Sequence, residues 1–471
     1  MSTLLRLLGL SVTLAVWACD PRPHFPEEVD PAVVGTRLPP GFLLGAATSS
    51  HQVEGGNVND WTDWENSSHP DGTPHVRNGE VSGQAVDSWN RFSDDLGALR
   101  HLGANGYRLS VEWSRLEPNP GEWNSAAADR YLDWMVQLRA GGIEPMVTLS
   151  HFTLPRWVAA QGGWESPQIK HQLAAFAGRV AALLGGQVDL WVTINEPNAL
   201  AVQGYLVGLW PPGKTDQAAA AQVLFNQLEA HVFMREAVRI NDTADADGDG
   251  AAARVGLVHH GRVLQPASSS VLDSTIAALA DDFANEVPLR AARTGRIQIN
   301  IPPGIAIDEE IPGLKDSFDF LGLNYYFRSY VRADLGLAAL SIQYSREDRP
   351  QSDLGWELYP EGMYLMLHRF ASVGVPIYVT ENGMADASGE VRPQFLLRHF
   401  DAMERAIADG VDVRGYLHWS LLHNFEWSDG WHPDFGLFAV DRTTFQRSPT
   451  PAVETLRRIA VNAGLSPEDV Y

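Results

Sequence analysis

The sequence predicts an α/β protein that folds as a single (β/α)8 TIM barrel, with its functional site at the carboxyl ends of the strands. Three observations support this prediction. Strand-like and helix-like segments alternate over residues 38–471 of the 471-residue chain, the strand-like segments number eight, and polar or aromatic residues follow them directly. In a barrel of parallel strands such residues meet at one rim, where side chains more often serve function than stability.

Each strand-like segment is a short apolar run that ends at a polar residue, a glycine or a proline. These segments cover residues 42–48, 107–113, 145–151, 190–195, 254–259, 318–325, 377–380 and 414–419. A helical spacing of apolar residues follows each of them, at residues 85–102, 129–140, 168–184, 217–240, 270–286, 360–373, 393–409 and 452–463. An open doubly wound sheet would show the same alternation, but a glycine-rich phosphate loop would then be expected after the first strand. Residues 45–50 lack its spacing, so the barrel is favoured.

Composition limits the class of partner. The chain has 35 Lys and Arg against 58 Asp and Glu, a net charge of −23, which excludes a nucleic-acid partner because little would neutralise phosphate. The hydrophobic content of 45% is enough for a large core. Fifteen tryptophans and twelve tyrosines are present, and some of these flat, polar-edged rings can stack on the face of a sugar.

The N-terminus has the features of an export signal. Arg6 precedes an apolar run over residues 7–18, which is too short to span a bilayer as a helix. Ala18 and Cys19, the single cysteine of the chain, end this run and resemble a bacterial lipoprotein signal, in which the cysteine is lipidated. Residues 1–18 are therefore predicted to be a signal peptide, and residues 19–37, rich in proline, a tether. An ordinary cleaved signal is the alternative, because Trp17 is bulky where lipoprotein signals favour small residues.

The resulting expectation is an exported protein of the bacterial cell envelope, facing the periplasm or the surface, with a lipid anchor as its membrane attachment. With one cysteine there is no internal disulfide, so the fold depends on its apolar core.

Two short segments carry the chemistry. Thr193-Ile194-Asn195-Glu196-Pro197 and Thr380-Glu381-Asn382-Gly383 each place a glutamate directly after a strand-like run, the fourth and the seventh of the eight. A barrel brings these strand ends around one pocket. Two carboxyl groups in one pocket are what the cleavage of a glycosidic bond requires. The alternative is that either glutamate is a buried salt-bridge partner.

Several further segments, in order along the chain, resemble glycoside hydrolase family 1, the β-glucosidase family. The segments are GFLLGAATSSHQVEG, YRLSVEWSRLEP, TINEP, FDFLGLNYY, YVTENG, YLHWSLLHNFEW and DFGLFAVD. The resemblance covers residues 38 to about 463. It implies a retaining exo-β-glycosidase, most readily a β-glucosidase that also accepts β-galactosides or β-fucosides, with a β-glycoside or β-linked oligosaccharide as substrate. It also implies that catalysis needs no cofactor.

The resemblance also implies roles for single residues. Glu196 would be the general acid/base and Glu381 the nucleophile. Arg108 and Tyr326 would hold Glu381 ionised, and Asn195 would bind the 2-hydroxyl of the sugar. The residues that would bind the terminal sugar, together with Asn195, are Gln52, His151, Trp419, Glu426, Trp427 and Phe435.

Four residues depart from the family pattern. Phe152 stands where a tryptophan is usual, and Asn198 stands where a tryptophan on the leaving-group side is frequent. His423 replaces an aspartate, and Asp434 replaces an arginine. Phe152 and His423 are expected to lie near the terminal-sugar site and to affect sugar preference, whereas Asn198 is expected to alter the site of the leaving group.

An acidic loop precedes the fifth predicted strand. Asp245, Asp247 and Asp249 alternate with small residues and lead to Gly250, the beginning of a calcium-binding loop. The twelfth position is Gly256, where a complete EF-hand loop has a bidentate glutamate. The sequence therefore predicts either a structural calcium ion or an acidic surface loop, and no catalytic role.

Two other functions remain as alternatives. An endo-acting β-glycanase of related fold would share the Asn-Glu-Pro segment but would have an open groove. A sugar-binding barrel without catalysis would be expected to lack one of the two glutamates, and both are present.

Overall fold

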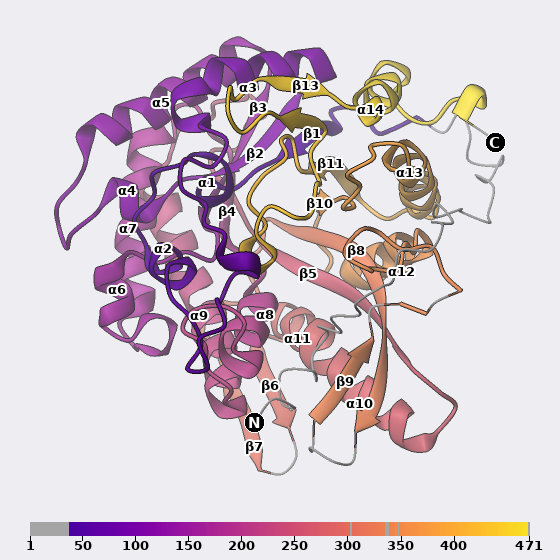
Figure 1. Cartoon of the computed structure of the whole chain (residues 1–471). Helices are drawn as coiled ribbons and strands as arrows, with labels where there is room; N and C mark the ends of the chain where they lie inside the picture. The colour runs from indigo at the N-terminus through magenta and orange to yellow at the C-terminus, as the bar shows by residue number, and fades with distance from the viewer. Residues whose placement is uncertain (1–36, 302–303, 335–338, 344, 347, 470–471) are drawn as a thin grey trace.

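The computed structural model describes residues 37–469 except 302–303, 335–338, 344 and 347. The predicted signal peptide, Cys19 and the tether up to residue 36 lie outside the described residues. Eight parallel strands form a closed barrel with helices around it (Figure 1), so the predicted fold is confirmed. In order around the barrel the strands are β1 (Leu43–Ala47), β2 (Gly106–Ser110), β3 (Glu144–Ser150), β4 (Leu190–Asn195), β5 (Arg254–Pro266), β8 (Phe320–Asp334), β10 (Ile377–Asn382) and β11 (Val413–Trp419).

Closure of the barrel comes from the pairing of β11 with β1, which aligns Trp419 with Ala47. Strands such as β4 and β10 are buried along their whole length. They are covered on both faces, by the barrel interior and by helices, and therefore form continuous β-branched and apolar runs. All eight predicted strands are confirmed, although β2 ends at Ser110 rather than at residue 113.

The helices that follow the strands also match the predicted segments closely. The long ones are α3 (Ser88–Leu102), α5 (Ser125–Ala140), α7 (Ile169–Leu184), α9 (Gln217–Asn241), α12 (Glu361–Ala371), α13 (Arg392–Ala408) and α14 (Pro451–Asn462). Shorter ones are α1 (Ser50–Val53), α2 (Asp60–Glu65), α4 (Trp113–Leu116), α6 (Arg156–Ala160) and α8 (Pro197–Leu200). Within the described part of the chain, no helix combines the length and apolar character needed to cross a bilayer.

The single helix predicted at residues 270–286 is wrong. The chain instead forms α10 (Val271–Asp281), a π-helical segment η5 (Asp282–Glu286) and α11 (Val287–Thr294). A second π-helical segment, η4 (Ala201–Val207), continues α8 after the fourth strand. Apolar spacing alone does not distinguish a π-helical turn from an α-helical one, and π-helical turns are frequent at functional sites.

The predicted ends of the fifth and sixth strands are also wrong. Both β5 and β8 continue past the rim of the barrel and stay paired there, from Val263 opposite Arg328 to Pro266 opposite Val331. β9 (Ala339–Gln343) adds to this extension, and a hairpin of β6 (Arg296–Ile301) and β7 (Ile305–Glu310) lies beside α11. A further small hairpin, β12 (Phe438–Val440) with β13 (Arg447–Pro449), follows the barrel.

Candidate active site

The two glutamates lie where their strands become irregular. Glu196 follows β4 with a left-handed backbone (φ 45°), and Pro197 begins α8 directly after it. The pairing of β10 with β8 shifts register between Val379 and Glu381, which places Glu381 opposite Asn324. Both side chains consequently point into the cavity at the carboxyl ends of the strands.

Glu381 is surrounded by donors. Arg108 Nη1 donates to Oε1 at 2.5 Å, and the Tyr326 hydroxyl donates to Oε2 at 2.6 Å. Burial and the charge of Glu381 raise the pKa of Tyr326 well above its ordinary value, so the hydroxyl keeps its proton and remains a donor. With one donor on each oxygen, the carboxyl group of Glu381 is held in a fixed orientation.

Glu196 has a different environment. Asn324 Nδ2 donates to its Oε1 at 2.7 Å, and His260 Nδ1 lies 3.8 Å from its Oε2. Burial and the negative charge of Glu381 raise the pKa of Glu196 to about 8, although Asn324 and Arg108 act in the opposite direction. Burial, with the charge of Arg262, lowers the pKa of His260 well below its ordinary value, so this ring adds no positive charge. Glu196 therefore holds a proton at neutral pH.

Asn195 connects the two carboxyl groups. Its Oδ1 accepts from Arg108 Nη2 at 2.6 Å and from Asn324 Nδ2 at 3.2 Å. Arg108 Nε donates to Thr148 Oγ1 at 3.0 Å, and Thr380 Oγ1 donates to Asn324 Oδ1 at 2.7 Å. The network fixes the orientation of both glutamates before any substrate binds.

A cavity of about 690 Å³ opens in front of the glutamates. Of the residues predicted from the sequence, the structure places eight in its wall: His151, Glu196, Tyr326, Glu381, Trp419, Glu426, Trp427 and Phe435. Gln52, Arg108 and Asn195 are buried behind that wall. The cavity volume is in the range of sites for small molecules.

Gln52 holds Glu426 in place. Its Nε2 donates to Glu426 Oε2 at 3.1 Å, to the Phe425 carbonyl at 2.9 Å and to Asn424 Oδ1 at 3.0 Å. Burial, with the negative charges of Asp429 and Glu381, raises the pKa of Glu426 well above its ordinary value. This carboxyl group can therefore carry a proton in the free protein, and donate as well as accept.

His151 lies between two tryptophans. Its ring is nearly parallel to those of Trp419 and Trp427, with centroids 6.0 and 6.1 Å away. Burial, together with the charge of Arg108, lowers the pKa of His151 well below its ordinary value. Its Nδ1 is buried without a hydrogen-bond partner among the described residues. The neutral ring and the two indoles together line the cavity, and flat, polar-edged rings of this kind suit a sugar.

The sequence as a whole matches a known family. The model of glycosyl hydrolase family 1 matches residues 34–463. The chain belongs to glycosyl hydrolase family 1. A β-galactosidase of Pyrococcus woesei is 31% identical to it, over 91% of this chain and 98% of the relative. β-Glucosidase A of Thermotoga maritima is also 31% identical, over 91% and 99% respectively.

Solved structures agree with this assignment. A β-glycosidase from Pyrococcus horikoshii superposes with a TM-score of 0.82 at 34% identity, covering 92% of this chain and 97% of that one. The family 1 chain is therefore a glycosidase by sequence and by fold.

The four departures from the family 1 pattern have distinct positions. Phe152 lines the cavity with a left-handed backbone (φ 70°), and its ring packs against those of Trp210 and Trp427. His423 and Asp434 are absent from the described wall and contact each other instead. His423 therefore lies behind the cavity wall, next to Asn424, which accepts from Gln52, and its effect on sugar preference stays a prediction.

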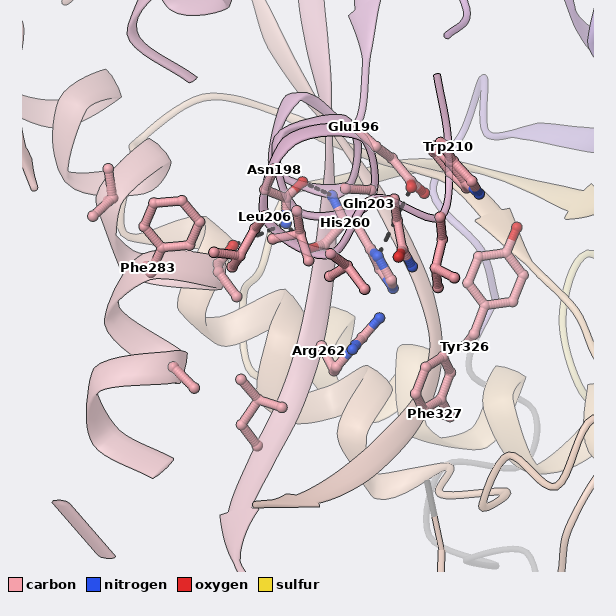
Figure 2. Close-up of a pocket in the computed structure, with 18 of the residues that line it drawn as sticks. Glu196, Asn198, Gln203, Leu206, Trp210, His260, Arg262, Phe283, Tyr326 and Phe327 are labelled. Atoms are coloured by element: carbon pink, nitrogen blue, oxygen red, sulfur yellow. Dashed lines mark hydrogen bonds and ion pairs between the residues drawn. The ribbon is translucent and has the colours of Figure 1, made fainter. Parts of the chain in front are cut away.

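Asn198 lines the cavity but uses its amide to bind the chain. Its Nδ2 donates to the carbonyls of His260 and Ala284, each at 2.9 Å. It thereby ties α8 to both β5 and η5, and the residue expected to alter the leaving-group site is part of the wall around it (Figure 2).

Sequence analysis missed several residues of this family 1 site. Asn324 contacts Glu196, and His260 lies beside it, yet neither was among the predicted site residues. His260 directly follows one predicted strand and Asn324 stands at the end of another, and that position was the signal that could have identified them. Trp210 and Trp356 also line the cavity, but they belong to loops whose course the sequence does not give.

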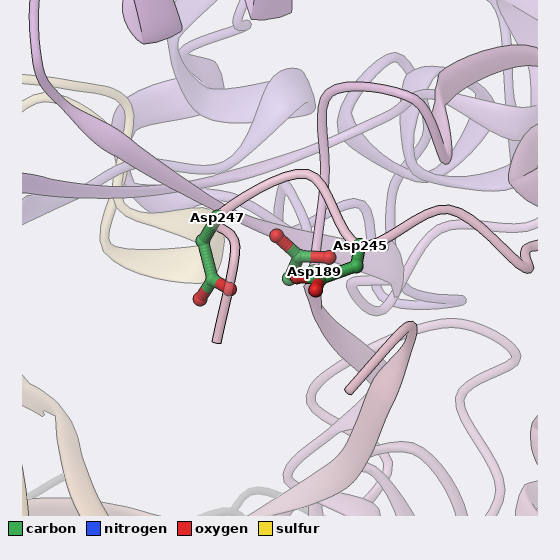
Figure 3. A group of neighbouring side chains, drawn as sticks. All are labelled: Asp189, Asp245 and Asp247. Carbon is green, nitrogen blue, oxygen red and sulfur yellow. The ribbon is translucent and has the colours of Figure 1, made fainter. Parts of the chain in front are cut away.

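The acidic loop lies away from the glutamates, at the amino end of β4. Oxygens of Asp189, Asp245 and Asp247 lie within 4.8 Å of one another (Figure 3). Asp249, predicted as the third member of the calcium loop, instead pairs with Arg254. Backbone amides of the loop donate to Asp245 and Asp247, and Asp189, which directly precedes β4, is the third carboxylate of the group. In a barrel this end contributes to stability rather than catalysis.

Proposed function

We propose that the protein is a retaining exo-β-glycosidase that acts on terminal β-D-glucosyl groups. The observation that carries this proposal is the unequal surroundings of two carboxyl groups in one cavity. Glu381 accepts from Arg108 and Tyr326, whereas burial and a neighbouring negative charge keep Glu196 protonated. A protonated acid beside an ionised nucleophile is the arrangement that double displacement requires.

In the first step, Glu381 attacks the anomeric carbon while Glu196 gives its proton to the departing oxygen. The bond between sugar and aglycone breaks, a covalent bond forms between sugar and Glu381, and the aglycone leaves as an alcohol. In the second step, Glu196 takes a proton from water, whose oxygen attacks the same carbon and releases Glu381. Both steps use side chains and water, so no cofactor is required.

The sugar-binding roles follow from position. Trp419 offers a flat face, and His151 and Glu426 offer polar atoms within the same cavity. The family 1 resemblance assigns the 2-hydroxyl to Asn195, which lies behind the glutamates and contacts Arg108 and Asn324. Relatives of this chain act as a β-galactosidase and a β-glucosidase. We therefore propose glucose as the main sugar, with galactose and fucose also accepted, and a panel of nitrophenyl β-D-glycosides measures this preference directly.

The decisive experiment removes the nucleophile. Glu381→Gly should abolish hydrolysis of nitrophenyl β-D-glucoside, and azide should restore turnover by filling the vacated space, with an α-glycosyl azide as product. Glu65→Gly, a change to a buried glutamate outside the cavity wall, serves as the control that azide has no general effect. A well-folded Glu381→Gly protein that azide does not rescue would overturn the assignment.

Substrate size separates the exo-acting enzyme from its alternatives. The exo-acting enzyme releases single sugars from aryl glycosides and short oligosaccharides. Rapid loss of viscosity of a β-glucan would indicate an endo-acting glycanase, and sugar binding without any turnover would indicate a binding barrel.

We also propose that the chain is exported to the bacterial cell envelope and that it is lipidated there at Cys19. The support is the short apolar run after Arg6, which ends at a small residue and the single cysteine. Radiolabelled palmitate should enter the wild-type protein and not Cys19→Ser, and the variant should leave the membrane fraction. Equal labelling of both proteins would contradict this proposal.

A further inference from the structure

The cavity extends well beyond the two glutamates, into a region that we call the apolar arm. Six apolar side chains define its wall: Leu206, Leu264, Leu272, Ile276, Leu279 and Phe283. They come from η4, from the extension of β5, from α10 and from η5. Figure 2 shows Phe283 on the side of Asn198 that faces away from Tyr326. The arm therefore begins at Glu196 and leads away from the sugar-binding residues.

Helix α10 presents an apolar stripe to this arm. Leu272, Ile276 and Leu279 recur at helical spacing, and Phe283 in η5 continues the series. A stripe of this kind normally packs against the core of its own protein. Here Leu272 and Leu279 remain 42% and 39% exposed, although both line the cavity. Apolar surface that is left open beside a reaction centre indicates an apolar ligand.

The wall of the arm is held open by side-chain amides. Asn198 ties α8 to the carbonyls of His260 and Ala284. Asn285 Oδ1 accepts from the Arg262 amide at 3.0 Å, and its Nδ2 donates to the Arg262 carbonyl at 2.7 Å. These contacts fix η5 against β5, so the arm cannot close by simple collapse of one wall on the other.

We propose that the apolar arm binds the aglycone of the substrate, and that this aglycone is an extended apolar group such as an alkyl or isoprenoid chain. The proposal rests on the proposed function, because the arm begins at Glu196, the group that protonates the departing oxygen. The leaving group must therefore lie at the entrance of the arm. Burial of each methylene against Leu264, Ile276 or Leu279 favours binding.

A second sugar fits this wall poorly. Gln203, Arg262 and Asp282 also line the cavity, but hydroxyl groups placed against the six apolar side chains would lose water without gaining hydrogen bonds, and such burial is unfavourable. The proposal therefore distinguishes apolar glycosides from β-linked disaccharides as substrates of the same catalytic pair.

The test is a series of alkyl β-D-glucosides from methyl to octyl, each below its micelle-forming concentration. We expect kcat/KM to rise by up to about fourfold for each added methylene that the wild-type enzyme buries, and octyl glucoside to exceed cellobiose. Ile276→Glu should flatten this rise. Val271→Glu, on the same helix but 83% exposed and outside the wall, should leave the rise unchanged. Leu279→Glu serves in place of Ile276→Glu if that variant does not fold.

A binding measurement separates this proposal from the proposed function. Alkyl 1-thio-β-D-glucosides resist hydrolysis, so calorimetry with them does not depend on turnover. If methyl and aryl glucosides are hydrolysed but kcat/KM does not depend on chain length, the role of the apolar arm is contradicted. The proposed glycosidase function is then still supported. If no glucoside is hydrolysed, thioglucosides that bind more tightly with length, and do so less in Ile276→Glu, would still support the arm. Thioglucoside affinity that is independent of length would overturn it.

Discussion

His423 Nδ1 lies 3.0 Å from Asp434 Oδ2, and the two side chains are only 20% and 14% exposed. The family 1 pattern has an aspartate at the first position and an arginine at the second, so in this chain the acidic residue stands at the second position instead of the first. Burial acts to raise the pKa of Asp434, but the contacts from His423 and Arg392 hold that pKa below its ordinary value. The departures from the family pattern at His423 and Asp434 therefore complement each other, because the two side chains are in contact. They flank the sugar site through their neighbours Asn424 and Phe435.

This pairing predicts that the two positions tolerate change only together. His423→Asp should lower the free energy of unfolding by about 1–3 kcal/mol, because two carboxylates then share a poorly hydrated contact. Asp434→Arg alone should also destabilise the protein, by placing an arginine beside His423 and near Arg392. The double variant should recover most of the loss in a denaturant titration. If the loss of unfolding free energy in the double variant equals the sum of the losses in the two single variants, the contact between His423 and Asp434 does not contribute to stability.

The raised pKa of Glu196 predicts the alkaline limit of activity. The acid must be protonated to assist departure of the leaving group, so kcat/KM should fall as the pH rises through about 8, the pKa of this group. Asn324→Ala removes a hydrogen bond that favours the ionised form, so the alkaline limb should move to higher pH. Asn226→Ala, which removes a buried contact to the Trp164 carbonyl outside the site, is the matched control. A limb that moves to lower pH in Asn324→Ala would contradict this environment for Glu196.

Loss of the acid should depend on the leaving group. Glu196→Ala should reduce kcat/KM by roughly 10²–10⁴-fold for methyl β-D-glucoside, whose departing alkoxide needs a proton. With dinitrophenyl β-D-glucoside the loss should be much smaller, since this leaving group departs as an anion. Steady-state kinetics on both substrates gives the comparison. Equal losses on the two would remove Glu196 from the proton-transfer role.

The acidic cluster at the amino end of the barrel predicts a response to calcium. Burial and the negative charge of Asp247 raise the pKa of Asp189, although Arg139 pairs with it and acts in the opposite direction, so a divalent cation would compete with Arg139 for this carboxylate. Added calcium should raise the thermal midpoint, and Asp247→Asn should abolish the increase. Asp249→Asn breaks the pair with Arg254 and should retain the calcium response. A midpoint that neither chelator nor calcium changes would exclude the ion.

Much of the barrel was predictable because its strands are buried on both faces. Runs such as residues 190–195 contain few polar groups, and the polar residue that follows each run marks the rim. Glu196 and Glu381 were located in this way. The extensions of β5 and β8 could not be predicted. Beyond the rim each of these strands pairs with the other, and the sequence of neither segment alone indicates that partner.

Contacts that depend on close approach were also beyond sequence reasoning. At Gly383 a side-chain carbon would lie 1.8 Å from the Trp419 carbonyl oxygen, so a glycine is needed for β10 to pass this strand. From the sequence alone, Gly383 indicated only that the strand before it ends there. Asn324 similarly gains its importance from Glu196 and Asn195, two residues distant in sequence.

The extension of β5 and β8 beyond the rim has an evolutionary consequence. The pairing of the barrel strands that positions Glu381 ends near Asn324, whereas Leu264 lies on the extension of β5 beyond the rim. Descendants of such a chain can rebuild the outer segments, or exchange them by recombination, while the catalytic half stays intact. New substrates would then be acquired by changing what departs from the sugar, at little risk to the reaction itself.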